Sequence, residues 1–205
     1  ELRQKAKFYP IFRTVDVLKW FPDAKKESVL HQLSLWIKKG YLERLRRDLY
    51  ILGDSNLADS RILSSLLYGP SYVSMETALN SYGMIPDIPF STTAVTTQKT
   101  KTFRTARYGM FLYHHIKPEL FFGFQTVDLK QGYGYSIALP EKALFDYFYF
   151  RARDIRNPQG FVEEMRLSLP EKFSFRGLKK WQSLIPPSQR NFHAILNAFF
   201  AFYDQ

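Results

Sequence analysis

The chain has no cysteine among its 205 residues, so it can form no disulfide, no thiolate metal site and no thiol nucleophile. Histidine is also scarce. None of the four, at positions 31, 114, 115 and 193, stands in an H-E-x-x-H pattern. Neighbouring His114 and His115 would point to opposite faces of a strand. We therefore expect no metal ion.

The sequence also lacks the motifs of common enzyme classes. It contains no P-loop, no Rossmann glycine run and no G-x-S-x-G nucleophile motif. Glu141 and Asp146 lie on one expected helix but five positions apart, which places them on different faces. Glu141 directly follows Pro140 and suits a first-turn residue that interacts with the helix dipole. We therefore expect no enzymatic activity and no cofactor.

Long apolar stretches are absent as well. No uninterrupted run approaches the ~20 residues that a membrane helix needs. The first ten residues, ELRQKAKFYP, lack the apolar core of a secretory signal. They resemble instead the end of a helix, which implies that a few residues of this helix precede Glu1. With the lack of cysteine, these features predict a cytoplasmic protein with no membrane partner.

Positive charge, by contrast, is abundant and unevenly distributed. The net charge is +10, and 45% of the residues are hydrophobic, enough for a sizeable core. Residues 1–53 hold 12 Lys+Arg and 6 Asp+Glu, a net charge of +6, whereas residues 54–205 hold 17 and 13, a net charge of +4. Over half of the excess charge thus lies in about a quarter of the chain, which favours a polyanionic partner there.

Residues 12–52 have the pattern of two short helices followed by a hairpin. Thr14 is the expected N-cap of the first helix, Asp16 lies in its first turn, and Pro22 ends it. The second helix, over residues 25–39, has an apolar face and ends at Gly40; that face consists of Val29, Leu33, Trp36 and Ile37. This order predicts a winged helix-turn-helix, a fold used mainly to hold one helix in the DNA major groove.

The hairpin alternates Leu45 with Arg44 and Arg46, turns at Arg47-Asp48, and returns over residues 49–51. We expect bases to be read from the second helix, and arginines to hold the backbone or reach a minor groove. The expected DNA-binding residues are Lys25, Lys26, Ser28, His31, Gln32, Lys38, Arg44, Arg46 and Arg47, with Ser28, His31 and Gln32 as base readers. The alternative is a small helical domain with a solvated basic face and no nucleic acid.

A polar break at residues 53–56 predicts two domains, 1–53 and 54–205. The second is expected to contain helices at 57–68 and 71–85, the latter capped by Ser74 and closed by Gly83, then antiparallel strands between 90 and 139. These strands are expected near 94–97, 101–104, 109–116, 123–129 and 135–139. Helices at 140–151, 158–168, 174–184 and 188–203 should follow. The expected fold is therefore α+β: an N-terminal winged helix-turn-helix followed by a larger α+β domain with a modest, mainly antiparallel sheet.

A second basic run crosses the expected strands and consists of Lys99, Lys101, Arg104 and Arg107. Alternation would place Lys99 and Lys101 on one side. The run is either a solvated sheet face or a second surface for DNA or RNA. The aromatic tail, with Phe192, Phe199, Phe200, Phe202 and Tyr203, is expected to be core, the alternative being cover for a partner or a second copy.

Three motifs carry a family resemblance. The segments GPSYVSMETALNSYGMIP (69–86), IALPEKALFDYFYF (137–150) and KKGYLERLRRDLYIL (38–52) resemble, in order and spacing, the landmarks of AbiEi-like antitoxins, the antitoxin half of abortive-infection toxin–antitoxin pairs of bacteria. The resemblance covers about residues 12–150. One departure is Asp48 at the hairpin turn, where the family usually has glycine.

The resemblance implies a transcriptional autorepressor that binds inverted repeats of double-stranded operator DNA. It also implies an antitoxin that opposes a nucleotidyltransferase-type toxin, in described members without need of a stable complex. Two other functions stay open from the residues alone. One is a winged-helix regulator with a ligand-sensing or dimerisation domain and no toxin partner. The other is an RNA-binding accessory protein that uses the second basic run.

Overall fold

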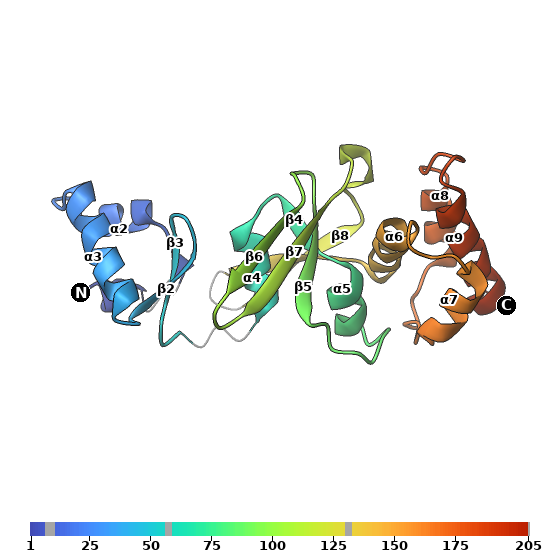
Figure 1. Ribbon diagram of the computed structural model, residues 1–205, viewed down its shortest axis with the longest axis horizontal. Helices are drawn as coiled ribbons and strands as arrows, with labels where there is room; N and C mark the ends of the chain where they lie inside the picture. Colours follow the sequence, from blue (N-terminus) through green and yellow to red (C-terminus); the bar gives the residue numbers. More distant parts are fainter. Residues whose placement is uncertain (7–10, 56–58, 130–132, 205) are drawn as a thin grey trace. The chain divides into compact units, whose positions relative to one another are not determined.

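The computed structural model describes residues 1–6, 11–55, 59–129 and 133–204 (Figure 1). The chain divides into two compact units: Glu1–Ser60 with Phe103–Tyr108, and Arg61–Thr102 with Gly109–Gln205. The described residues contain nine α-helices, a short 3-10 helix and two sheets, so the prediction of a mixed α+β fold is confirmed. In this part of the chain, every helix is too short or too polar to cross a membrane.

The first unit builds a small helical layer on a three-stranded sheet. Its elements in order are α1 (Leu2–Ala6), β1 (Ile11–Phe12), α2 (Thr14–Trp20), α3 (Lys26–Lys38), β2 (Leu42–Arg46) and β3 (Leu49–Leu52). The sheet is antiparallel in the order β1-β3-β2. Strand β1, which has only two residues, was not predicted from the sequence. Residues 7–10, which the reading assigned to the end of the first helix, lie outside the described residues.

Helix α3 buries the apolar face that its sequence predicts. Val29 and Leu33 are buried in the core of the first unit, and Trp36 and Ile37 pack against that core half-buried. The helix ends as expected at Gly40, whose φ of +73° lies in the left-handed region that glycine adopts without steric penalty. The opposite face of α3 is consequently directed to solvent.

The start of α2 differs from the prediction. Arg13, not Thr14, is the N-cap, and its backbone N–H donates to the Asp16 carboxylate at 2.8 Å. Thr14 is already helical, and its own N–H donates to Asp48 Oδ1 at 3.1 Å. A carboxylate 34 positions away thus satisfies a donor at this helix start, which a local sequence pattern cannot reveal.

The second unit is organised around a six-stranded sheet with the order β6-β7-β5-β4-β9-β8. Its strands are β4 (Ser71–Val73), β5 (Ser91–Thr96), β6 (Lys101–Thr105), β7 (Gly109–His115), β8 (Phe124–Leu129) and β9 (Tyr133–Ala138). β4 pairs with β5, and β8 with β9, in antiparallel fashion, but β4–β9 and β5–β7 are parallel. The sheet is therefore mixed and has six strands, so the prediction of a modest, mainly antiparallel sheet is met only in part.

The helix predicted over residues 71–85 is too long at both ends. Residues 71–73 form β4, which pairs with a strand on each side, and α5 spans only Met75–Ser81. Two ladders of backbone hydrogen bonds outweigh the helical pattern of the local sequence. Met75 begins α5 with a φ of +55°, an unusual conformation for a non-glycine residue.

The remaining helices match the predictions to within a few residues. They are α4 (Ser60–Leu67), α6 (Pro140–Arg151), α7 (Pro158–Met165), α8 (Phe175–Gln182) and α9 (Arg190–Tyr203). Figure 1 shows α6 between the sheet and the group formed by α7, α8 and α9, and α6 packs against α5, α8 and α9. In the aromatic tail, Phe192 and Phe199 are buried, as expected of core residues, whereas Phe202 is exposed.

The division between the units falls later than the sequence break. The first unit continues to Ser60 and includes the tip of the β6–β7 hairpin, Phe103–Tyr108. Within that unit, the Arg107 guanidinium donates to the carbonyls of Gly53 and Ser55 at 2.5 and 2.7 Å. The Ala106 N–H donates to Glu43 at 3.1 Å. The two Arg107 bonds attach the hairpin tip to the polar break at residues 53–56, where the sequence predicts the domain boundary.

Candidate functional site

Helix α3 presents a polar face to solvent. All six residues expected to contact DNA from α3 and its N-cap are exposed: Lys25, Lys26, Ser28, His31, Gln32 and Lys38. At 3.6 residues per turn, His31 lies about 200° around the helix from Val29, almost opposite the core. Gln32 lies on the flank of this face. None of the three lysines forms an ion pair with a described acid, so their charges remain available to a partner.

The three hairpin arginines lie in different environments, although the sequence predicts the same role for all of them. The side chains of Arg44 and Arg47 are exposed and bind no described acid or carbonyl. Arg46 is half-buried: its Nη1 donates to the Arg47 carbonyl at 3.4 Å, and its Nε is buried without a hydrogen-bond partner among the described residues. Leu45 is buried between them, as predicted. Arg44 and Arg47 are therefore the better placed for phosphate.

The tip of the hairpin is fixed by Asp48. Its φ of +62° is a left-handed conformation that aspartate tolerates better than most residues, so the predicted turn at Arg47-Asp48 is confirmed. Its carboxylate also accepts the hydrogen bond from Thr14 described above. The hairpin tip and the start of α2 are thereby held together, which orders the arginine-bearing loop next to the helical layer.

The second basic run is divided between the two units. Lys99 and Lys101 belong to the second unit, but Arg104 and Arg107 belong to the first. Lys99 precedes β6, so strand alternation does not apply to it, and its placement on one side with Lys101 stays a prediction. Arg104 and Arg107 are both exposed, but Arg107 already binds two carbonyls. The run thus breaks into separate groups with different environments.

The second unit contains a buried polar cluster that was not predicted from the sequence. Asp146 of α6 accepts hydrogen bonds from the hydroxyl groups of Tyr72 and Ser74, at 3.0 and 2.7 Å, and from the Lys142 ammonium group. Lys142 also lies against the rings of Tyr72, Phe122 and Phe145. The available signal was the i, i+4 spacing of Lys and Asp in an otherwise apolar helix.

Burial shifts both partners of this pair toward their neutral forms. It lowers the pKa of Lys142 and raises the pKa of Asp146, while the attraction between the two charges opposes each shift. Both side chains are fully buried. The cluster lies in the interior and joins α6 to β4 through buried hydrogen bonds.

No metal centre is evident in the part of the chain that the structure describes. No group of three His, Asp or Glu side chains there could hold a metal ion. Glu141 lies in the first turn of α6, where it was expected, and its Oε1 accepts from the backbone N–H of Ser174 at 2.6 Å.

Comparison with models of protein families and with curated proteins finds no match to this chain.

Proposed function

We propose that this chain is a DNA-binding transcriptional autorepressor and the antitoxin of a toxin–antitoxin system. In this proposal residues 1–53 are a winged helix-turn-helix, α3 is its recognition helix and β2–β3 is its wing. The observation that carries it is the exposed polar face of α3 together with Arg44 and Arg47, all on one small unit that holds most of the excess positive charge. The order helix, strand, two helices and hairpin is that of winged domains.

Within the recognition helix, each exposed group has a distinct role. His31 and Gln32 offer hydrogen bonds to base edges, and Ser28 can pair with either a donor or an acceptor. Lys25, Lys26 and Lys38 lie at the two ends of α3, where they would meet phosphates. Arg44 and Arg47 on the wing would hold the backbone or enter the minor groove. Half-buried Arg46 would stiffen the turn and add charge.

DNA from the chain's own promoter tests the first half of this proposal. We expect tighter binding to this DNA than to random duplex at ~0.15 M salt. A plot of log Kd against log salt concentration should have a slope of about 0.9 for each phosphate neutralised. Replacing Arg44 and Arg47 by Ala should reduce this slope. The matched control replaces exposed Arg176 and Lys180 of α8, which removes the same charge from the second unit. Equal binding to random duplex would contradict specific repression.

The antitoxin half of the proposal rests on the resemblance of residues 69–86 and 137–150 to antitoxin landmarks. We propose that this activity lies in residues 54–205 and opposes a nucleotidyltransferase-type toxin. Its test looks for a nucleotidyltransferase-like gene beside the gene of this chain and co-expresses that neighbour with the full chain. The variant without Arg44 and Arg47 should still rescue growth, although it no longer represses. If the neighbour were harmless alone, the chain would instead be a winged-helix regulator without a toxin.

A further inference from the structure

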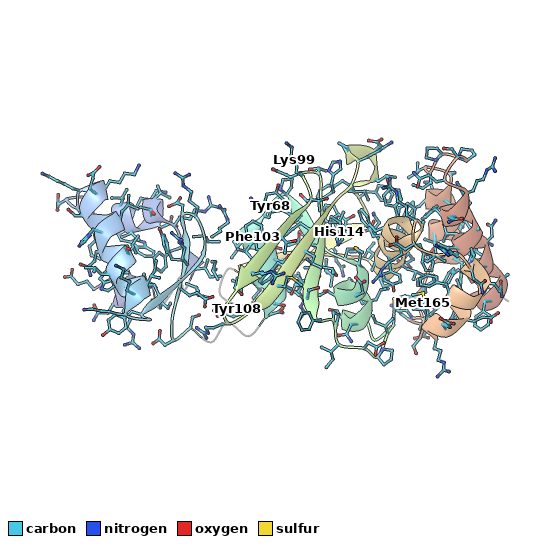
Figure 2. The ribbon with its side chains drawn as sticks, viewed as in Figure 1. Tyr68, Lys99, Phe103, Tyr108, His114 and Met165 are labelled. Atoms are coloured by element: carbon cyan, nitrogen blue, oxygen red, sulfur yellow. The ribbon has the colours of Figure 1, made fainter. Side chains whose placement is uncertain are left out.

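The second unit contains a cavity of about 400 Å³. It lies where one face of β5 and β7 meets the start of α5 and the end of α6. Its lining combines apolar and charged side chains, notably Met75, Glu76, Phe90, His114, Phe150, Arg151 and Asp154. This size is in the range of small-molecule sites in proteins. His114, labelled in Figure 2, lies on the sheet and forms part of the wall.

Glu76 gives the cavity an unused acceptor. Its Oε1 accepts a hydrogen bond from Arg151 Nη2 at 2.9 Å. Its Oε2 is buried and receives no hydrogen bond from the described residues. A buried carboxylate oxygen without a donor is unfavourable, so this side chain gains when a donor reaches it.

The charges around the cavity favour a cation. Glu76 and Asp154 carry two negative charges against the single positive charge of Arg151. Burial lowers the pKa of His114, so this imidazole is neutral at pH 7 and adds no charge. Helix α6 also directs its C-terminal end here, because its last residue is Arg151. A net negative site stands out in a chain whose overall charge is +10.

Aromatic and apolar side chains complete the site. The Phe150 ring lies against the His114 ring, with centroids 5.1 Å apart. Phe90 lines the cavity and is 92% exposed, so its ring is available to cover a ligand. Aromatic faces attract cations, and the buried side chain of Met75 offers contact to an alkyl stem.

We propose that this cavity binds a small organic cation that carries N–H donors on a short apolar stem, a guanidinium or a primary ammonium compound. The cationic head is attracted by the carboxylates of Glu76 and Asp154, while its stem contacts Phe90, Phe150 and Met75. His114 accepts or donates a further hydrogen bond as a neutral ring. Such binding does not depend on the DNA-binding or antitoxin roles.

The test uses the full chain with n-butylguanidinium, n-butylammonium and the neutral isostere n-butylurea. Each ligand is added to about 10 mM while NMR spectra are recorded. This range suits a Kd of about 1 mM, the value expected of ligands of this size. We expect n-butylguanidinium or n-butylammonium to shift the imidazole signals of His114, identified with the His114→Gln variant. We expect n-butylurea to bind at least tenfold more weakly. No shift with either cation, or equal binding of the urea, would overturn the proposal.

Two variants localise the cation. Glu76→Gln should weaken n-butylguanidinium binding at least tenfold, but it also disturbs the bond to Arg151. Asp154→Asn, at an exposed position, keeps that bond and should weaken binding severalfold. Glu119→Gln is the control, because it removes the same charge from an exposed residue outside the cavity. If Asp154→Asn and Glu119→Gln had equal effects, the cavity would not be the binding site.

Discussion

Asp48 at the hairpin turn accepts a hydrogen bond from the backbone N–H of Thr14, the first residue of α2, at 3.1 Å. One residue therefore performs two tasks: it adopts the left-handed conformation of the turn, and it satisfies a free donor at a helix start. Glycine at this turn could do only the first. Asp48 thus has a structural role in this chain that glycine could not fill.

Substitutions at Asp48 separate these two tasks. Asn keeps a side-chain acceptor and tolerates a positive φ, so Asp48→Asn should be nearly neutral. Asp48→Gly loses the capping bond and should cost about 0.5–2 kcal/mol. Asp48→Ala loses the bond and also strains the turn, by about 1–2 kcal/mol more. Thermal unfolding should rank Asn above Gly and Gly above Ala. An Ala variant as stable as the Gly variant would show that the turn conformation is not limiting.

His31 and Gln32 should determine base preference rather than overall affinity. Both are exposed on α3, and each lost base contact should change discrimination by about 1–3 kcal/mol. His31→Ala and Gln32→Ala should therefore alter the ranking of operator variants and leave the salt slope unchanged. Ser34→Ala, a substitution at another exposed position of α3, is the control. Uniform weakening on every operator variant would argue against base reading by these residues.

The buried Lys142–Asp146 pair should behave as a coupled unit. Lys142→Met leaves Asp146 buried with hydroxyl donors alone and should cost about 3–5 kcal/mol. The double variant Lys142→Met, Asp146→Leu removes both charges, so its cost should be smaller than the sum of the single costs by about 1–3 kcal/mol. Urea unfolding of the single and double variants measures this difference. Additive costs would mean that the two charges do not stabilise each other.

His114 should make stability depend on pH. Burial lowers its pKa in the folded protein below the usual 6.5, although Glu76 and Asp146 oppose this shift. As the pH falls through 6.5, the unfolded chain takes up a proton before the folded chain does, so the free energy of unfolding decreases. The melting temperature should therefore fall more steeply between pH 7 and pH 5 in the wild type than in His114→Gln. Parallel profiles would contradict this role.

Local patterns in the sequence determined most of the first unit. The apolar stripe of α3, the glycine that ends it and the turn at Arg47-Asp48 are all where the sequence predicts, because periodicity, caps and turns depend on neighbouring residues. The span of α6, residues 140–151, was predictable for the same reason. The exposure of the polar face of α3 follows from the burial of the opposite face.

Only the tertiary structure decided the rest. Strand β4, read as helix, exists because β5 and β9 pair with it from distant parts of the chain. Asp146 found its hydroxyl donors 74 and 72 positions away, and Glu76 met Arg151 across 75 positions. Hydrogen bonds and ion pairs of this kind act through space over a few ångströms, whatever the separation along the chain. A linear pattern records which groups can bond, whereas folding selects the partners that each group meets.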